Sequence, residues 1–120
     1  MLHEVKGARQ VQGEGPRRWF TDVYFDLIVW YDEAGGIEGF QLCYDKFKKE
    51  RALTWRKASG FTHEKVDDGE KVLQIKMTPI LLPDGIFDAN AICEKFRMES
   101  VEIDPEIARF VSEVLQAYPR

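Results

Sequence analysis

The sequence predicts an α+β domain, in which an antiparallel β-meander of about four or five strands carries one or two C-terminal helices packed on one face. Three observations support this fold class. Apolar and polar residues alternate through much of residues 24–77, as in β-strands. The period becomes helical over residues 107–118, and the strand patterns precede the helical ones along the chain. The length of 120 residues suits one domain, residues 1–120.

The strongest strand signal is residues 24–32, which are rich in aromatic and β-branched side chains. Leu27, Val29 and Tyr31 share one side of such a strand, and the apolar residues between them share the other. Because both sides are apolar, we expect a central strand that is covered on both faces. Four residues are candidates for an apolar surface left over after the helices dock, which would favour a homodimer: Tyr24, Phe25, Ile28 and Trp30.

A β-hairpin is predicted directly after this strand. Residues 32–36 have the composition of a hairpin loop, in which Gly35 and Gly36 supply the turn conformation. Residues 37–45 form the returning strand, with Phe40 and Leu42 on one face. Similar or weaker alternation predicts three further strands: residues 4–12 at an edge, residues 51–57 and residues 71–77.

The C-terminal helix is predicted from a stripe of apolar residues at helical spacing. Asp104 suits the N-cap, Pro105 suits the first turn, and Pro119 ends the segment. Residues 88–99 predict a second helix, because Ile92 and Phe96 lie one turn apart. The stripe consists of Ile107, Phe110, Val111, Val114, Leu115 and Tyr118.

Charge and composition limit the classes of function. Seventeen Lys and Arg against 21 Asp and Glu give a net charge of −4, which argues against a broadly basic nucleic-acid binder. The longest apolar run, residues 27–31, is too short to span a membrane, and the first residues lack the pattern of a secretory signal. We therefore expect a cytoplasmic protein without a membrane partner, in which Cys43 and Cys93 are reduced and packed as small apolar residues.

A metal site is one hypothesis for residues 62–70, which hold one imidazole and four carboxylates. Histidine and carboxylate groups bind divalent ions, so a metal-assisted hydrolase would centre on His63, Asp67 and Asp68. The spacing matches neither a zinc-peptidase helix nor a calcium loop, and residues 67–69 have the composition of an exposed turn. We therefore expect no metal and no cofactor.

The second candidate site is a basic stretch within residues 44–57, where aromatic residues separate the cations. Such a mixture can bind an acidic protein, another anionic partner or a nucleic-acid backbone. The alternative is a solvated loop beside an edge strand that lysines protect against aggregation. The candidate partner-binding residues are Lys46, Lys48, Lys49, Arg51 and Trp55.

Through residues 26–32, 39–46, 50–55 and 66–70 the chain resembles small uncharacterised bacterial proteins that are classed as domains of unknown function. This resemblance covers most of the chain and implies a bacterial cytosolic setting. It implies no established activity, and therefore it contributes no catalytic or ligand-binding residues.

The sequence contains no recognisable catalytic constellation, so we expect a non-enzymatic binding domain that interacts with an acidic or other anionic partner or with a second copy of itself. The two alternatives are the small metal-assisted hydrolase and a nucleic-acid accessory protein that uses residues 46–57. No catalytic residues are predicted.

Overall fold

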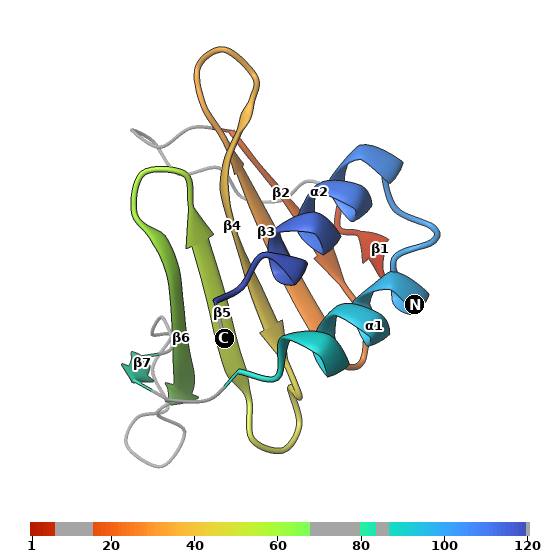
Figure 1. Ribbon diagram of the computed structural model, residues 1–120. Helices are drawn as coiled ribbons and strands as arrows, with labels where there is room; N and C mark the ends of the chain where they lie inside the picture. The colour runs from red at the N-terminus through yellow and green to blue at the C-terminus, as the bar shows by residue number, and fades with distance from the viewer. Residues whose placement is uncertain (7–15, 68–79, 84–86, 120) are drawn as a thin grey trace.

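The computed structural model describes residues 1–6, 16–67, 80–83 and 87–119. Within them, each strand pairs antiparallel with the next, in the order β1-β2-β3-β4-β5-β6-β7. Both helices lie on one side of this sheet (Figure 1), which confirms the predicted α+β meander. The elements are β1 (His3–Glu4), β2 (Arg17–Thr21), β3 (Phe25–Tyr31), β4 (Ile37–Tyr44), β5 (Arg51–Arg56), β6 (Gly60–Asp67), β7 (Ile80–Pro83), α1 (Ala89–Glu99) and α2 (Pro105–Gln116).

The described sheet has more strands than predicted, because β2 and β6 were not recognised from the sequence. Both form by pairing with a stronger strand: Phe20 of β2 lies opposite Leu27, and His63 of β6 lies opposite Leu53. The exposed turn predicted over residues 67–69 lies outside the described residues except for Asp67, which is the last residue of β6. The predicted strand over residues 71–77 lies outside the described residues, and so does most of the edge strand predicted over residues 4–12.

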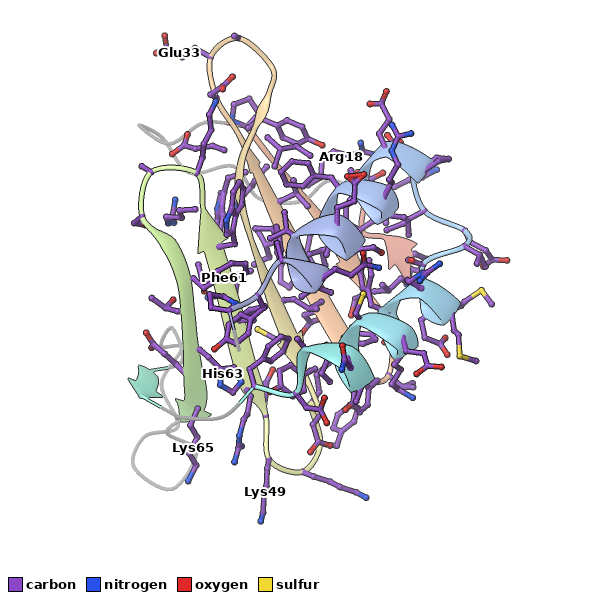
Figure 2. The ribbon with its side chains drawn as sticks, viewed as in Figure 1. Arg18, Glu33, Lys49, Phe61, His63 and Lys65 are labelled. Carbon is purple, nitrogen blue, oxygen red and sulfur yellow. The ribbon has the colours of Figure 1, made fainter. Side chains whose placement is uncertain are left out.

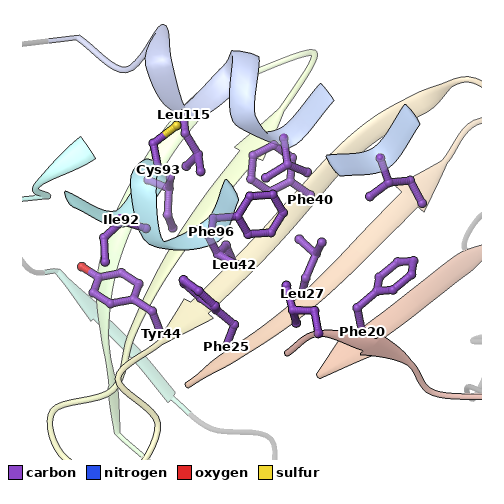
Figure 3. Close-up of a cluster of buried hydrophobic side chains, with 14 of the residues drawn as sticks. Phe20, Phe25, Leu27, Phe40, Leu42, Tyr44, Ile92, Cys93, Phe96 and Leu115 are labelled. Atoms are coloured by element: carbon purple, nitrogen blue, oxygen red, sulfur yellow. The ribbon is translucent and has the colours of Figure 1, made fainter. Parts of the chain in front are cut away.

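The hydrophobic core fills the space between the sheet and the two helices (Figure 3). Phe25 and Phe96 are fully buried and meet edge to face, with ring centroids 5.9 Å apart. Burial of side chains of this size stabilises the fold by about 1.5–3 kcal/mol each. Phe25 therefore belongs to the core, and its predicted place on a leftover surface was wrong. Tyr24 also lies on the helical side, where the Lys95 ammonium sits 4.6 Å from its ring centroid.

Both helices begin as the sequence predicts. The Asp88 carboxylate accepts a hydrogen bond from the Ala91 amide at the start of α1, over a distance of 3.1 Å. The Asp104 carboxylate accepts one from the Glu106 amide at the start of α2, over 3.0 Å. These bonds satisfy amides that have no partner within a first helical turn. No helix in the described part of the chain is long and apolar enough to cross a membrane.

The β3–β4 hairpin also has the predicted loop. The Asp32 amide donates to the Gly36 carbonyl over 2.8 Å, and the Asp32 carboxylate accepts from the amides of Ala34 and Gly36. Gly35 has a φ of 87°, a conformation that side chains with a Cβ rarely adopt. The loop is therefore held by its own hydrogen bonds.

Candidate binding surfaces

One face of the sheet, here called the open face, carries no helix among the described residues. Strand register places the open-face side chains in rows, and one row runs from Trp19 through Ile28 and Gln41 to Thr54. The prediction that β3 is covered on both faces was thus wrong for its outer face, as far as the described helices are concerned (Figure 1). In its middle rows the open face consists of Arg17, Trp19, Ile28, Trp30, Gln41, Thr54, Arg56 and Thr62.

Two tryptophans dominate the open face. Trp19 is 37% exposed, and Trp30 is half-buried on the neighbouring strand. The Arg56 guanidinium lies 4.3 Å from the centre of the Trp30 ring, and it is 4.0 Å from the Glu38 carboxylate. The cation–π contact holds both side chains against the sheet. Tryptophan and arginine are the residue types most enriched at the energetic centres of protein interfaces.

The other end of the open face carries carboxylates. Asp26 lies opposite Cys43 in the register, and Glu64 lies opposite Ala52. The Lys46 ammonium is 3.0 Å from the Asp26 carboxylate, and it also donates to the Thr21 hydroxyl over 3.1 Å. Glu64 makes no ion pair with any described residue, so it remains a charged group on this surface.

Cys43 is half-buried on the open face. Burial, together with the nearby Glu50 and Asp26 carboxylates, raises the pKa of its thiol to about 12. A thiol needs a stabilised thiolate to act as a nucleophile. The surroundings of Cys43 oppose that chemistry, so its role is packing.

The predicted basic site is divided by the fold. Lys46 is held by Asp26 and by the Asp22 carbonyl, 2.8 Å away, so its charge is already engaged. The Arg51 guanidinium donates to the Lys49 carbonyl over 2.9 Å. Lys48 and Lys49 are exposed on the turn between β4 and β5, and Figure 2 shows Lys49 extending away from the helices.

Trp55, the aromatic member of the predicted basic site, lies on the helix-covered face. Its ring meets Phe110 of α2 edge to face at 5.5 Å, and it lies 6.1 Å from the Phe40 ring. The structure therefore separates Trp55 from the exposed lysines. None of the five candidate residues has its own place on the open face. Lys46 reaches the edge of that face through its contact with Asp26.

His63 projects toward the helical side of β6 and is half-buried (Figure 2). Its Nε2 atom is 2.6 Å from the Tyr44 hydroxyl, and the two rings stack with centroids 5.9 Å apart. The Phe87 ring lies 5.2 Å away. No group of three or more His, Cys, Asp or Glu side chains that could hold a metal occurs in the described parts of the chain. Asp67 belongs to β6, and Asp68 lies outside the described residues.

A cavity of about 650 Å³ lies between α2 and the β3–β4 hairpin. The Arg18 guanidinium lines it and pairs with Glu4 at 2.7 Å and with Asp104 at 3.1 Å. The hydrogen bond from Arg18 lowers the pKa of Glu4, whereas the Glu106 amide and then Arg18 lower the pKa of Asp104. The charge of Arg18 is thus satisfied by Glu4 and Asp104.

A second hollow, of about 480 Å³, lies between the end of α1 and the outer side of α2. Arg97, Arg109 and the buried Ser100 line it. Sequence analysis identified neither this groove nor Trp19. The groove forms only when two separate helices pack together, and Trp19 lies in a strand without a clear alternating pattern.

The chain matches no protein-family model, no curated protein and no solved structure.

Proposed function

We propose that this chain is a binding domain that uses the open face to pair with a second copy of itself. The observation that carries the proposal is the pair of partly exposed tryptophans, Trp19 and Trp30, on a face that no described helix covers. Large apolar groups in contact with water favour association, and this face joins them to an arginine. The sheet already has its core on the other side, and no helix among the described residues covers the open face.

The placement of charge favours a second copy as that partner. Arg56 lies at the hairpin end of the open face, and Glu64 lies in the row of Ala52. Four residues separate the two rows, or about 13 Å along the strands. A twofold axis that runs across the strands within the interface reverses the strand direction of the second copy. The cationic end of each copy then meets the carboxylate end of the other, as an isologous interface requires.

Sheet-to-sheet packing supplies a suitable geometry for this dimer. Two sheets pack face to face at about 10 Å when their inner side chains interdigitate. The small or polar side chains of Gln41 and Thr54 leave room beside Trp19 and Ile28 in the central row. Because an axis across the strands places each strand opposite the same strand of the other copy, the two Trp19 rings meet in this row, where that room accommodates them.

The experiment exchanges the charges of Arg56 and Glu64 by mutation. Sedimentation velocity over a wide range of protein concentration then measures the dimerisation of each variant. We expect wild type to dimerise, and we expect Arg56→Glu and Glu64→Arg each to weaken the dimer about tenfold, which corresponds to ~1.4 kcal/mol. The double variant Arg56→Glu/Glu64→Arg restores the complementary arrangement and is expected to recover most of the loss. Trp19→Gln removes the apolar centre and should leave a monomer.

Lys48→Glu is the matched control, because it makes the same charge change on an exposed turn outside the open face. It should dimerise like wild type. A wild-type protein that remains monomeric at every concentration would overturn the proposal. If the double variant dimerises no better than the two single variants, this arrangement of the two copies is also rejected.

A further inference from the structure

We infer that the groove between α1 and α2 binds an amphipathic organic anion, in which a carboxylate or phosphate group is joined to a small apolar body. The groove has a volume of about 480 Å³, within the range of about 300–1,000 Å³ that is typical of small-molecule sites. Its lining combines a buried hydroxyl that no described residue hydrogen-bonds, two arginines and an apolar wall. This site is separate from the open face, because it lies on the helical side of the sheet.

The buried hydroxyl belongs to Ser100, which ends α1 and is 4% exposed. Its carbonyl accepts from the Ile103 amide over 3.4 Å. Its hydroxyl has no hydrogen-bond partner in the described part of the protein. A buried polar group without a partner is destabilising, and an anionic oxygen of a ligand would satisfy it.

The two arginines give the groove its preference for an anion. Arg97 is in the last turn of α1 and Arg109 is on α2, and both side chains are exposed. Neither guanidinium forms an ion pair or a side-chain hydrogen bond with a described residue, in contrast to Arg18 in the neighbouring cavity. Planar guanidinium groups bind carboxylate and phosphate oxygens in a bidentate manner.

One carboxylate opposes this charge. Glu113 also lines the groove and lies one helical turn after Arg109. Carboxylates at this spacing attract an arginine on the same helix, so Glu113 competes with a ligand for Arg109. Removal of the Glu113 charge is therefore expected to strengthen binding rather than weaken it.

The apolar wall is formed by Val101, Ile103, Pro105 and Ala108. Val101 is 67% exposed, which is a high fraction for a branched apolar side chain. An apolar ligand body laid along this wall would remove Val101 from water. The ligand is thus expected to need both its charge and its apolar part.

Anilinonaphthalene sulfonate is a suitable probe, since it joins an anionic group to apolar rings and its fluorescence rises in apolar surroundings. Phenylnaphthylamine carries the same rings without the charge and serves as the matched ligand. We expect saturable binding of the sulfonate, much weaker binding of the neutral ligand, and amide shifts in nuclear magnetic resonance spectra at residues 97–113. Arg97→Gln and Arg109→Gln should each weaken binding by about tenfold, Ser100→Ala should weaken it by less, and Glu113→Gln should strengthen it.

Two control variants separate this site from the rest of the surface. Lys48→Gln removes an exposed charge elsewhere, and Trp19→Gln changes the open face; both should bind the sulfonate like wild type. Unchanged circular dichroism and melting temperature would show that the arginine variants are folded. The inference is overturned if both arginine variants bind normally, if the neutral ligand binds equally well, or if the shifted amides lie on the open face.

Discussion

The two faces of the sheet differ although the same strands build them. Along β3, Phe25, Leu27 and Val29 are fully buried beneath the helices, whereas the alternate residues Ile28 and Trp30 are half-buried on the open face. Both sets are apolar, so composition alone does not distinguish them. The comparison of the two faces shows that the position of the helices, and not the composition of the strands, determines which face becomes the core. Ile28 and Trp30, the second apolar set, therefore remain at the surface, and we propose that they take part in binding.

The largest expected effect is on the free energy of unfolding, and it compares Leu27 on the core face with its neighbour Ile28 on the open face. Leu27→Ala creates a cavity in the core and should lower the free energy of unfolding by about 2–5 kcal/mol. Ile28→Ala removes a similar volume from the open face and should cost only about 1 kcal/mol. Urea unfolding of the monomeric Trp19→Gln background measures both. Equal losses would mean that the two faces are equally important for the fold.

An intermediate effect is expected at two lysines of the β4–β5 turn. Lys46 is engaged with Asp26 and Thr21 at one end of the open face, whereas Lys48 is exposed. Lys46→Met leaves these polar groups without their donor and should cost about 1–3 kcal/mol. Lys48→Met should change stability by less than about 0.5 kcal/mol. Thermal unfolding compares the two, and similar melting temperatures would contradict the assigned role of Lys46.

The smallest expected effect is on the alkylation rates of the two thiols, which lie on opposite sides of the sheet. Cys43 is half-buried on the open face with a pKa of about 12, and Cys93 is buried beside the Ser112 carbonyl at 3.6 Å. At pH 8 only about one Cys43 in ten thousand is a thiolate, so alkylation should be slow and should accelerate about tenfold per pH unit. Cys93 should react only after unfolding. Mass spectrometry of each peptide gives both rates, and fast alkylation of Cys43 at neutral pH would contradict this assignment.

The sequence was sufficient to predict elements whose signals are local. The apolar stripe and Asp104 predicted α2, and the alternation on either side of Gly35 predicted the hairpin. The sequences of β2 and β6 have no regular alternation, since Trp19 and His63 lie among charged residues. These two strands form because they pair with their neighbours in the sheet, and so their own sequences did not predict them.

The candidate sites were harder to predict, because they depend on residues that are distant in the sequence. The basic composition of residues 44–57 identified Lys46 but not its contact with Asp26, which comes from another strand. The position of Trp55 beneath α2 depends on how the helix docks. The groove at Ser100 likewise requires both helices in place, and no local pattern in the sequence indicates it.

The attachment of Leu2 has a consequence for the order in which the domain is made. The Leu2 side chain is fully buried, and its amide donates to the Glu99 carbonyl at the end of α1 over 2.8 Å. The ribosome synthesises Leu2 before its partner Glu99, which follows only after all the described strands. Consecutive strands can pair as they emerge, because each neighbour in the sheet is also the next in sequence. Until α1 and α2 follow, the nascent sheet presents its apolar face to water, and we expect that face to be prone to aggregation during this interval.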